Sequence, residues 1–257
     1  MMNFRIRPAI VLFGDSLTQF SFGESGGIGW DLHGVGWGSL LASAYQRRAD
    51  VFNRGFSGYN TRFAREVLPR VFGKSNGEDD NADDNGILFA TVFLGANDAT
   101  IPGERQHVPI DEYGTNLEYI ISSIRSRCGT PSFPIFVLSP PPVDQEAWRK
   151  HREIDYFDRT NENSRAYGLV AKRVAEKLGC CFIDTWKCLG GDGPASDYGK
   201  HLSDGLHLTE SGNRLIFDEL LGLIRKDFPQ LAPMVDGDER YGEIGIPVEE
   251  KIWTELC

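Results

Sequence analysis

A serine follows directly on a short apolar run near the start of the chain. Residues 9–16 read AIVLFGDS, an apolar stretch of strand length that ends in Gly-Asp-Ser. In a parallel α/β sheet, reactive groups gather beyond the carboxyl ends of the strands, and Gly14 permits a tight exit from this strand. Ser16 is therefore a candidate nucleophile. A serine hydroxyl is weak on its own, so it needs a base, an acid that orients the base, and donors for an oxyanion.

His207 has the best sequence context of the five histidines as the base. It lies in a polar turn three residues after Asp204, and an aspartate there can hold the imidazole in one tautomer and stabilise its protonated form. An Asp-x-x-His pair alone is also compatible with a turn-capping aspartate and a surface histidine. The remaining histidines lack such a partner or lie in loops that nothing singles out: His33, His107, His151 and His201.

Three groups are candidates for holding a tetrahedral oxyanion. They are the backbone N–H of Ser16, the backbone N–H of Gly55 and the side-chain amide of Asn97. One well-aimed donor is worth on the order of 3 kcal/mol in the transition state. Taken singly, Gly55 and Asn97 are equally compatible with ordinary turn residues.

Strand-like and helix-like segments alternate along the chain. Apolar runs predict strands at residues 9–13, 87–94, 134–138 and 180–184, and residues 51–55 read as a further strand and its exit. Apolar residues at helical spacing predict helices at residues 37–45, 61–71, 113–124, 156–178 and 209–224. Such alternation predicts a five-stranded parallel sheet with helices on both faces. Right-handed crossovers then bring Ser16, Gly55 and Asn97 to one edge, because each lies at the end of one of the first three strands.

Three stretches fall outside this pattern of strands and helices, within one domain predicted for residues 1–257. The glycine-dense loop at residues 23–36 is either a lip of the active-site pocket or a cover over the sheet edge. The acidic stretch at residues 73–86 predicts a solvated insertion, because its acids lack the spacing of a calcium loop. The tail at residues 228–257 is expected to pack back on the domain.

Composition excludes several other classes of function. A net charge of −10 and a pI near 5.0 argue against nucleic acid or an anionic membrane surface as the main partner. No apolar run is long enough for an integral membrane segment. A signal peptide is not expected, since its cleavage site would adjoin Ser16. The five cysteines match no zinc spacing and are expected to be reduced thiols in a cytoplasmic protein.

Four blocks of the chain, taken in order, resemble the GDSL/SGNH esterase–lipase superfamily. They are residues 14–17 (GDSL), Gly55, residues 95–98 (GAND) and residues 204–207 (DGLH). The resemblance implies that the family's Ser, Gly, Asn and His fall on Ser16, Gly55, Asn97 and His207, with Asp204 completing the triad.

Residues 53–62 (NRGFSGYNTR) and 203–208 (SDGLHL) closely resemble the isoamyl acetate-hydrolysing esterases. That resemblance implies a three-layer, flavodoxin-like α/β/α sandwich and hydrolysis of small acyl esters. Homodimers among such relatives imply a monomer or a homodimer. The acidic stretch at residues 73–86 departs from the family pattern.

The sequence therefore predicts a carboxylic ester hydrolase that needs no metal or cofactor and acts on a small-molecule ester. A lysophospholipase, a thioesterase or a carbohydrate deacetylase would use the same residues. A non-enzymatic binding module would lack a triad member, whereas all are present here. A flavin or nucleotide binder would carry a glycine-rich phosphate cradle after the first strand, where this chain has Gly-Asp-Ser-Leu.

Overall fold

The protein folds around one five-stranded parallel sheet. The computed structural model describes residues 7–23, 34–73, 86–128 and 132–233. Within them the strands lie in the order β2-β1-β3-β4-β5, and all pairs are parallel. This is the flavodoxin-like doubly wound order, in which ligands bind beyond the carboxyl ends of the strands. The strands are β1 (Ala9–Gly14), β2 (Asp50–Gly55), β3 (Ile87–Phe93), β4 (Ile135–Leu138) and β5 (Cys181–Ile183).

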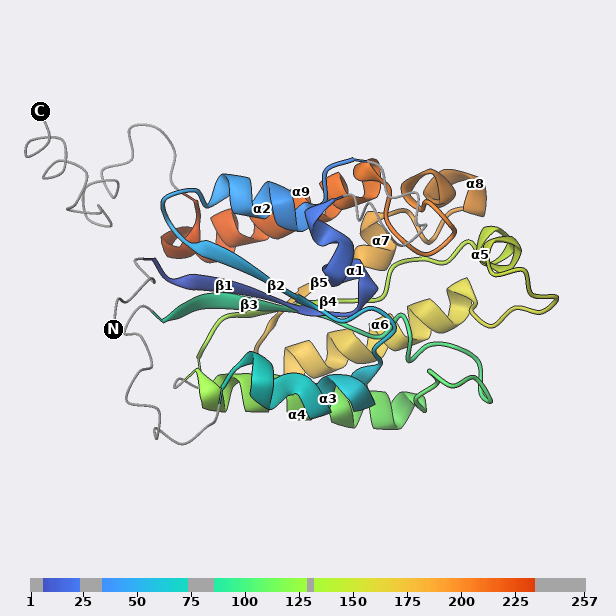
Figure 1. Cartoon of the computed structure of the whole chain (residues 1–257), viewed down its shortest axis with the longest axis horizontal. Helices are drawn as coiled ribbons and strands as arrows, with labels where there is room; N and C mark the ends of the chain where they lie inside the picture. Colours follow the sequence, from blue (N-terminus) through green and yellow to red (C-terminus); the bar gives the residue numbers. More distant parts are fainter. Residues whose placement is uncertain (1–6, 24–33, 74–85, 129–131, 234–257) are drawn as a thin grey trace, which may run out of the picture.

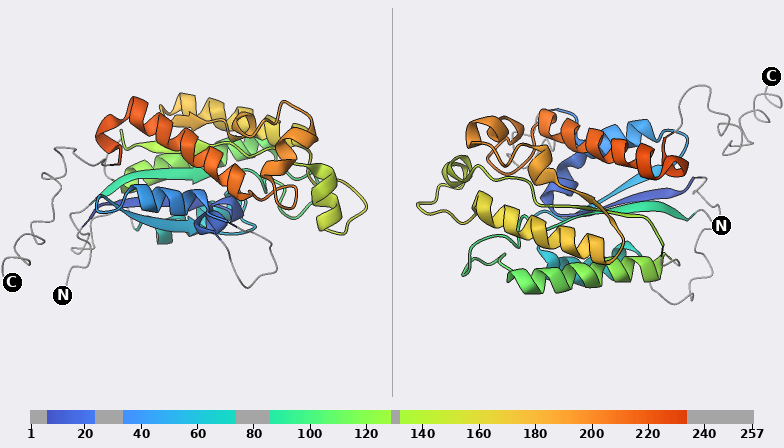
Figure 2. Two further views of the ribbon diagram at one scale, coloured as in Figure 1. Left: turned by 90° about the horizontal axis from the view of Figure 1, so that it is seen from above. Right: turned by 180° about the vertical axis from the view of Figure 1, so that it is seen from behind.

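Helices cover both faces of the sheet, so the fold is the predicted three-layer α/β/α sandwich (Figure 1). Helices α2 and α9 lie on one face, and helices α3, α4 and α6 lie on the other (Figures 1 and 2). The longer helices are α2 (Trp37–Ala44), α3 (Thr61–Val71), α4 (Ile110–Arg127), α5 (Gln145–His151), α6 (Asn161–Lys177) and α9 (Glu210–Asp227). The short ones are α1 (Ser16–Gln19), η1 (Phe20–Phe22), α7 (Thr185–Cys188), α8 (Ala195–Tyr198), η2 (Gly199–His201) and η3 (Pro229–Leu231).

The two faces of the sheet bury separate hydrophobic cores. Ile10 and Leu12 of β1 pack with Trp37 and Leu41 of α2 on one side. The alternate residues of the same strand, with Phe13 among them, pack against α3, α4 and α6 on the other. Because successive side chains of a strand point to opposite faces, one continuous apolar strand can serve both cores. Burial on both faces fixes β1 in the centre of the fold.

One predicted helix is wrong in its extent. Residues 156–178 were expected to form a single long helix, but α6 begins only at Asn161. Thr160 caps it: the Thr160 hydroxyl accepts a hydrogen bond from the Asn163 N–H at 3.1 Å. The residues before this cap form a loop. An additional helix, α5, which the sequence did not predict, precedes that loop.

Parts of the three unassigned stretches lie outside the described residues, namely 24–33, 74–85 and 234–257. Only the start of the predicted tail, residues 228–233, is described. Leu231 and Ala232 are buried in the core beside α2 and α9, and the Tyr45 hydroxyl donates to the Leu231 carbonyl at 2.9 Å. Among the described helices, none combines the length and apolar character needed to cross a bilayer.

Candidate active site

Ser16 lies where β1 ends and α1 begins. A Cβ on Gly14 would come within 2.5 Å of the Phe93 carbonyl oxygen, so only glycine lets the chain turn so close to β3. Asp15 caps α1, since its Oδ1 accepts a hydrogen bond from the Leu17 N–H at 3.0 Å. Ser16 is the first residue of the helix, where a backbone N–H has no partner within the helix. That N–H is thus available to a substrate oxygen.

Ser16, His207 and Asp204 form a continuous chain of hydrogen bonds. The Ser16 Oγ lies 2.9 Å from the His207 Nε2, and the His207 Nδ1 lies 2.6 Å from the Asp204 Oδ2. All three side chains are almost fully shielded from solvent. This geometry permits transfer of a proton from the serine hydroxyl to the imidazole while the carboxylate holds the other ring nitrogen.

The turn that carries Asp204 and His207 packs against the start of α5. Gly205 has a φ of +97°, and a Cβ there would come within 2.5 Å of the Asp144 carbonyl and the Trp148 N–H. The Asp144 N–H in turn donates to the Gly205 carbonyl at 2.9 Å. The start of α5 is therefore fitted against this turn, and glycine at position 205 is a packing requirement.

Asp204 is held in its charged form. Burial alone would raise the pKa of this carboxyl, but hydrogen bonds from the His207 ring and from two backbone N–H groups outweigh it and lower the pKa. Those N–H groups belong to Leu206 and His207 and lie 2.9 and 2.8 Å from Asp204 Oδ1. An ionised Asp204 suits the stabilisation of a protonated imidazole.

Aromatic rings pack against the His207 imidazole. The Phe20 ring lies 5.6 Å and the Trp148 ring 6.0 Å from it, both edge-on. His151 stacks on Trp148, and its Nε2 lies 3.9 Å from Asp204 Oδ2. The expectation that His151 has no acidic partner is therefore wrong, because His151, the last residue of α5, lies beside Asp204.

A cavity of about 150 Å³ opens beside Ser16 and His207. Asn97, at the end of β3, lies in its wall, as does Gly58 in the loop after β2. Gly58 has a φ of +80°, and no described residue accepts a hydrogen bond from its N–H. Asn97 and Gly58 thus border the same space as Ser16.

Gly55, by contrast, has a different role from the one that was predicted. It does not line this cavity, and its N–H donates to the Asn53 Oδ1 at 2.9 Å. A Cβ at this position would come within 2.0 Å of the Gln19 N atom. Gly55 is therefore required for close packing of β2 on α1, and its N–H is already engaged. Gly58, three residues later, is the glycine that lies at the site.

Two polar residues that the sequence did not suggest contact Asn97. Arg159 Nη2 and Gln106 Nε2 both donate to the Asn97 Oδ1 at 3.0 Å. The Asn97 Nδ2 donates to the Tyr59 carbonyl at 2.9 Å. In the structure Gln106 and Arg159 lie in connecting segments. Gln106 belongs to no predicted element and Arg159 falls within the predicted helix at residues 156–178, and neither carried a sequence signal for the site.

Two carboxyl groups are fully buried behind the nucleophile. Burial raises the pKa of Asp15 to about 7 and that of Asp98 to about 6, and the nearby charge of Asp98 adds to the effect on Asp15. Asp98 Oδ1 accepts a hydrogen bond from the Thr61 N–H at 3.0 Å, which ties the end of β3 to the start of α3. Both carboxyls support the strand ends rather than face the cavity.

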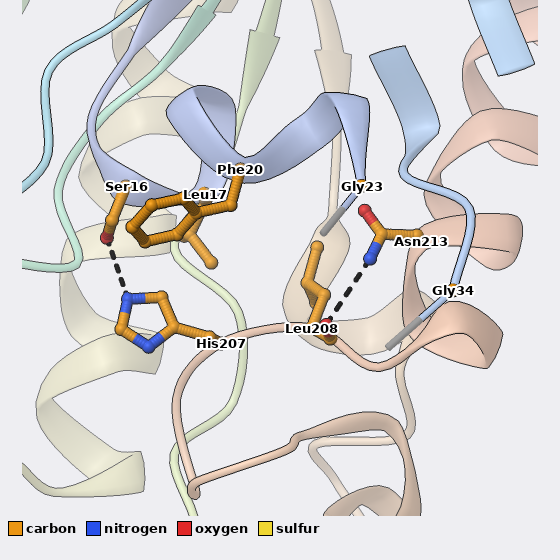
Figure 3. Close-up of a pocket in the computed structure, with 8 residues that line it drawn as sticks. All are labelled: Ser16, Leu17, Phe20, Gly23, Gly34, His207, Leu208 and Asn213. Carbon is orange, nitrogen blue, oxygen red and sulfur yellow. Dashed lines mark hydrogen bonds between the residues drawn. The ribbon is translucent and has the colours of Figure 1, made fainter. Parts of the chain in front are cut away.

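A second, smaller pocket of about 20 Å³ also borders Ser16 and His207 and is lined by Phe20 (Figure 3). Figure 3 shows Ser16 and His207 facing each other at one end of it and Asn213 at the other, with the Phe20 ring beside the serine. Its wall also includes Gly23 and Gly34. Residues 24–33, which separate them in the sequence and were expected to form either a lip of the pocket or a cover over the sheet edge, lie outside the described residues.

The described residues contain no group of three or more side chains suited to holding a metal ion. Four cysteines, Cys128, Cys180, Cys181 and Cys188, are unpaired. The arrangement offers one set of chemical groups: an activated hydroxyl, a proton acceptor with an ionised partner, and donors that surround a small cavity. These are the parts needed for acyl transfer through an oxyanion.

Comparison with known proteins points to the same chemistry. The GDSL-like Lipase/Acylhydrolase family model matches residues 12–215. A rat isoamyl acetate-hydrolyzing esterase 1 homolog (Rattus norvegicus) is 38% identical over 233 residues, which cover 88% of this chain and 86% of the relative. The isoamyl acetate-hydrolyzing esterase of Saccharomyces cerevisiae is 33% identical over 231 residues, covering 87% and 88%. The crystal structure of a lipase/acylhydrolase from Enterococcus faecalis has the same fold, with a TM-score of 0.61 and 22% identity over 89% of this chain and 99% of that one.

Proposed function

The chain belongs to the GDSL-like lipase/acylhydrolase family and is a carboxylic ester hydrolase, and from this premise we propose that it cleaves small short-acyl esters through Ser16, His207 and Asp204. The observation that carries the proposal is the unbroken series of hydrogen bonds from Asp204 through His207 to the Ser16 Oγ. The Ser16 end of that series opens into a cavity that Asn97 and Gly58 also line.

In the proposed reaction, the Ser16 Oγ attacks the ester carbonyl carbon while His207 Nε2 takes the hydroxyl proton. The negative charge that develops on the carbonyl oxygen is met by the N–H groups of Ser16 and Gly58 and by the Asn97 Nδ2. The C–O bond to the alcohol then breaks, and His207 returns the proton to the leaving oxygen. Water, deprotonated by His207, attacks the resulting acyl-enzyme, which releases the carboxylic acid and restores Ser16.

The size of the cavity supports a small acyl group. Pockets that enclose drug-sized ligands have volumes of roughly 300–1,000 Å³. The space beside Ser16 and Asn97 measures about 150 Å³ and that beside Phe20 about 20 Å³. The relatives named for isoamyl acetate hydrolysis support the same substrate class, an acetate ester of a small alcohol.

A second candidate substrate follows from a wider groove that adjoins the site. This groove, of about 430 Å³, shares Ser57, Gly58, Gln106 and Arg152 with the active-site cavity. Phe63, which is 39% exposed, lies in its wall. A polar groove with exposed aromatic surface suits the alcohol part of a larger acetate ester, such as an acetylated saccharide.

A comparison of rates on different esters distinguishes the two substrate classes. Initial rates on isoamyl acetate, isoamyl butyrate, isoamyl octanoate and a peracetylated disaccharide, each with Ser16→Ala as the blank, test both acyl length and alcohol. The short-acyl proposal predicts the highest kcat/KM on the isoamyl acetate or butyrate. A preference for octanoate would favour a lipase, lysophospholipase or thioesterase, and a preference for the disaccharide would favour a carbohydrate deacetylase.

The proposal also includes a cytoplasmic location and a monomer or homodimer. The four unpaired cysteines among the described residues support a reducing compartment. Fractionation of cells that express the full chain, and light scattering on the purified protein, test these two points.

A further inference from the structure

One glutamine side chain connects the two proposed oxyanion donors that lie outside the nucleophile turn. The Gln106 Nε2 donates to the Gly58 carbonyl at 2.8 Å and to the Asn97 Oδ1 at 3.0 Å. The Gln106 backbone is itself fixed, because its carbonyl accepts a hydrogen bond from the Asn60 Nδ2 at 2.9 Å. The loop that contains Gly58 and the end of β3 that carries Asn97 are thus held to one another through Gln106.

An arginine next to this glutamine donates hydrogen bonds to three oxygen atoms. Arg159 Nη2 donates to the Gln106 Oε1 at 2.8 Å and to the Asn97 Oδ1 at 3.0 Å, and Nη1 donates to the Ala96 carbonyl. Arg159 is only 4% exposed, and its guanidinium lies over the Trp148 ring, 5.2 Å from the centroid. Burial lowers its pKa to about 10, so it remains charged at neutral pH.

The chemistry of the guanidinium decides which way both amides point. A side-chain amide has an oxygen and a nitrogen of nearly equal size, whereas a guanidinium has donors only. Arg159 therefore requires that the oxygens of Asn97 and Gln106 face it. The Asn97 Nδ2 then donates to the Tyr59 carbonyl, which leaves its second hydrogen for the cavity that Asn97 lines, and the Gln106 Nε2 donates to the Gly58 carbonyl. A reversed Asn97 would present a lone pair to the oxyanion and oppose the reaction.

We propose that Arg159 and Gln106 are positioning residues of the oxyanion hole. Arg159 fixes the orientation of the Asn97 amide, and Gln106 transmits that constraint to the Gly58 loop. The inference rests on the proposed ester hydrolysis at Ser16. Under this proposal Arg159, a buried residue outside the Ser16–His207–Asp204 series, affects kcat by orienting the Asn97 amide.

The test compares three variants with a matched control. Arg159→Met removes the guanidinium and keeps an unbranched chain. Gln106→Glu keeps an acceptor for Arg159 but, when ionised, has no hydrogen to give to Asn97 or Gly58. Asn97→Ala removes the amide on which both act. Arg165→Met is the control, because Arg165 also lies over a tryptophan ring, that of Trp186, and pairs with a carboxylate, Asp184, away from the site.

Arg159→Met and Gln106→Glu are expected to lower kcat on a short-chain ester by about 10- to 100-fold, since a misdirected donor loses much of the 10²–10³-fold that it contributes. KM should change by less than about threefold, because the ground-state ester carbonyl depends little on these donors. Arg165→Met should retain the kcat of the wild type. If Arg159→Met does not fold, as judged by its thermal unfolding, Arg159→Lys and Gln106→Glu carry the same comparison.

The decisive readout is a double-mutant cycle with Asn97. In the Asn97→Ala background, adding Arg159→Met should lower kcat by no more than about threefold further, because residues that act through one group are not additive. If Arg159→Met lowers kcat as much in the Asn97→Ala background as it does in the wild type, Arg159 has a merely structural role and the proposal is overturned. An unchanged kcat in both Arg159→Met and Gln106→Glu would also overturn it. Activity that persists in Ser16→Ala would instead refute the proposed function, so the two failures are distinguishable.

Discussion

The Ser16 Oγ and the His207 Nε2 lie 2.9 Å apart, although 191 positions separate the two residues in the chain. One lies just after strand β1, which is flanked by β2 and β3, and the other lies in the turn before the last long helix, α9. Their meeting depends on the doubly wound topology, which brings the end of β1 to the same edge of the sheet as the final turn (Figure 1). The predictions below follow from that arrangement.

The orienting role of Asp204 predicts the effect of Asp204→Asn. An asparagine oxygen can still accept the two backbone hydrogen bonds from Leu206 and His207, so the turn should persist. The charge that stabilises the imidazolium is lost, and kcat should fall by about 10²–10⁴-fold. Asp184→Asn, at the N-cap of α7, is the matched control and should keep the kcat of the wild type. A loss below about fivefold in Asp204→Asn would contradict the role.

Asn97 should contribute to kcat and little to KM. Its Nδ2 is placed to donate to an oxyanion that exists only in the transition state, so Asn97→Ala should lower kcat by about 10²-fold. Asn116→Ala serves as the control, since Asn116 is equally buried but bonds to Thr61 and Arg65 instead. Steady-state kinetics on a p-nitrophenyl ester measure both constants. A kcat within about twofold of the wild type would refute the oxyanion role.

Gly55 should matter for stability because of its close packing. A Cβ there would meet the Gln19 N at 2.0 Å, so Gly55→Ala should lower the free energy of unfolding by about 1–3 kcal/mol. Gly222→Ala offers the contrast: it lies on the exposed side of α9 with nothing within 4 Å and should stabilise by about 0.5–1 kcal/mol. Urea unfolding of both variants tests the difference. Equal stability of Gly55→Ala and the wild type would rule out the packing role.

Asp15 should make the stability of the fold depend on pH. Burial raises its pKa from 3.8 to about 7 in the folded protein, so the folded state holds this proton more tightly than the unfolded chain. Its contribution is therefore most favourable at low pH and is lost as the pH rises from about 4 to about 7. Asp15→Asn keeps an oxygen for the Leu17 N–H and has no proton to lose.

The stability of Asp15→Asn relative to the wild type should therefore increase as the pH is raised through that interval. A tenfold change in proton affinity corresponds to about 1.4 kcal/mol, so the increase should exceed about 1 kcal/mol. Urea unfolding of both proteins at several pH values measures it. A difference that is constant with pH would show that the Asp15 carboxyl titrates alike in the folded and unfolded chains.

The fold was predictable because its strands are encoded locally. Each buried strand is a continuous apolar run, and β1 shows this best, since alternate residues serve the two cores. The extent of α6 was not predictable in the same way. The apolar pattern continues before Asn161, and only the hydrogen bond from the Asn163 N–H to the Thr160 hydroxyl shows where the helix begins.

The candidate site was predictable only in part. Ser16, Asn97 and His207 follow strand ends or precede a helix, and their positions could be read from that pattern. Gly58 was missed in favour of Gly55, because one glycine ends β2 and the other follows it by three residues, and only the path of the chain in space shows which one reaches the cavity. Arg159 was missed because it was placed near the start of a predicted helix, where a single arginine is normally exposed to solvent and does not signal burial.

The central claim is that Ser16 becomes acylated, and covalent labelling tests it most directly. The wild-type protein and Ser16→Ala are treated with a serine-reactive fluorophosphonate, and intact mass and peptide mapping follow the adduct alongside hydrolysis of p-nitrophenyl acetate. The account predicts one adduct on Ser16, with loss of hydrolysis in step with labelling, and neither adduct nor hydrolysis in Ser16→Ala. An adduct on another residue, or equal hydrolysis by both proteins, would contradict it.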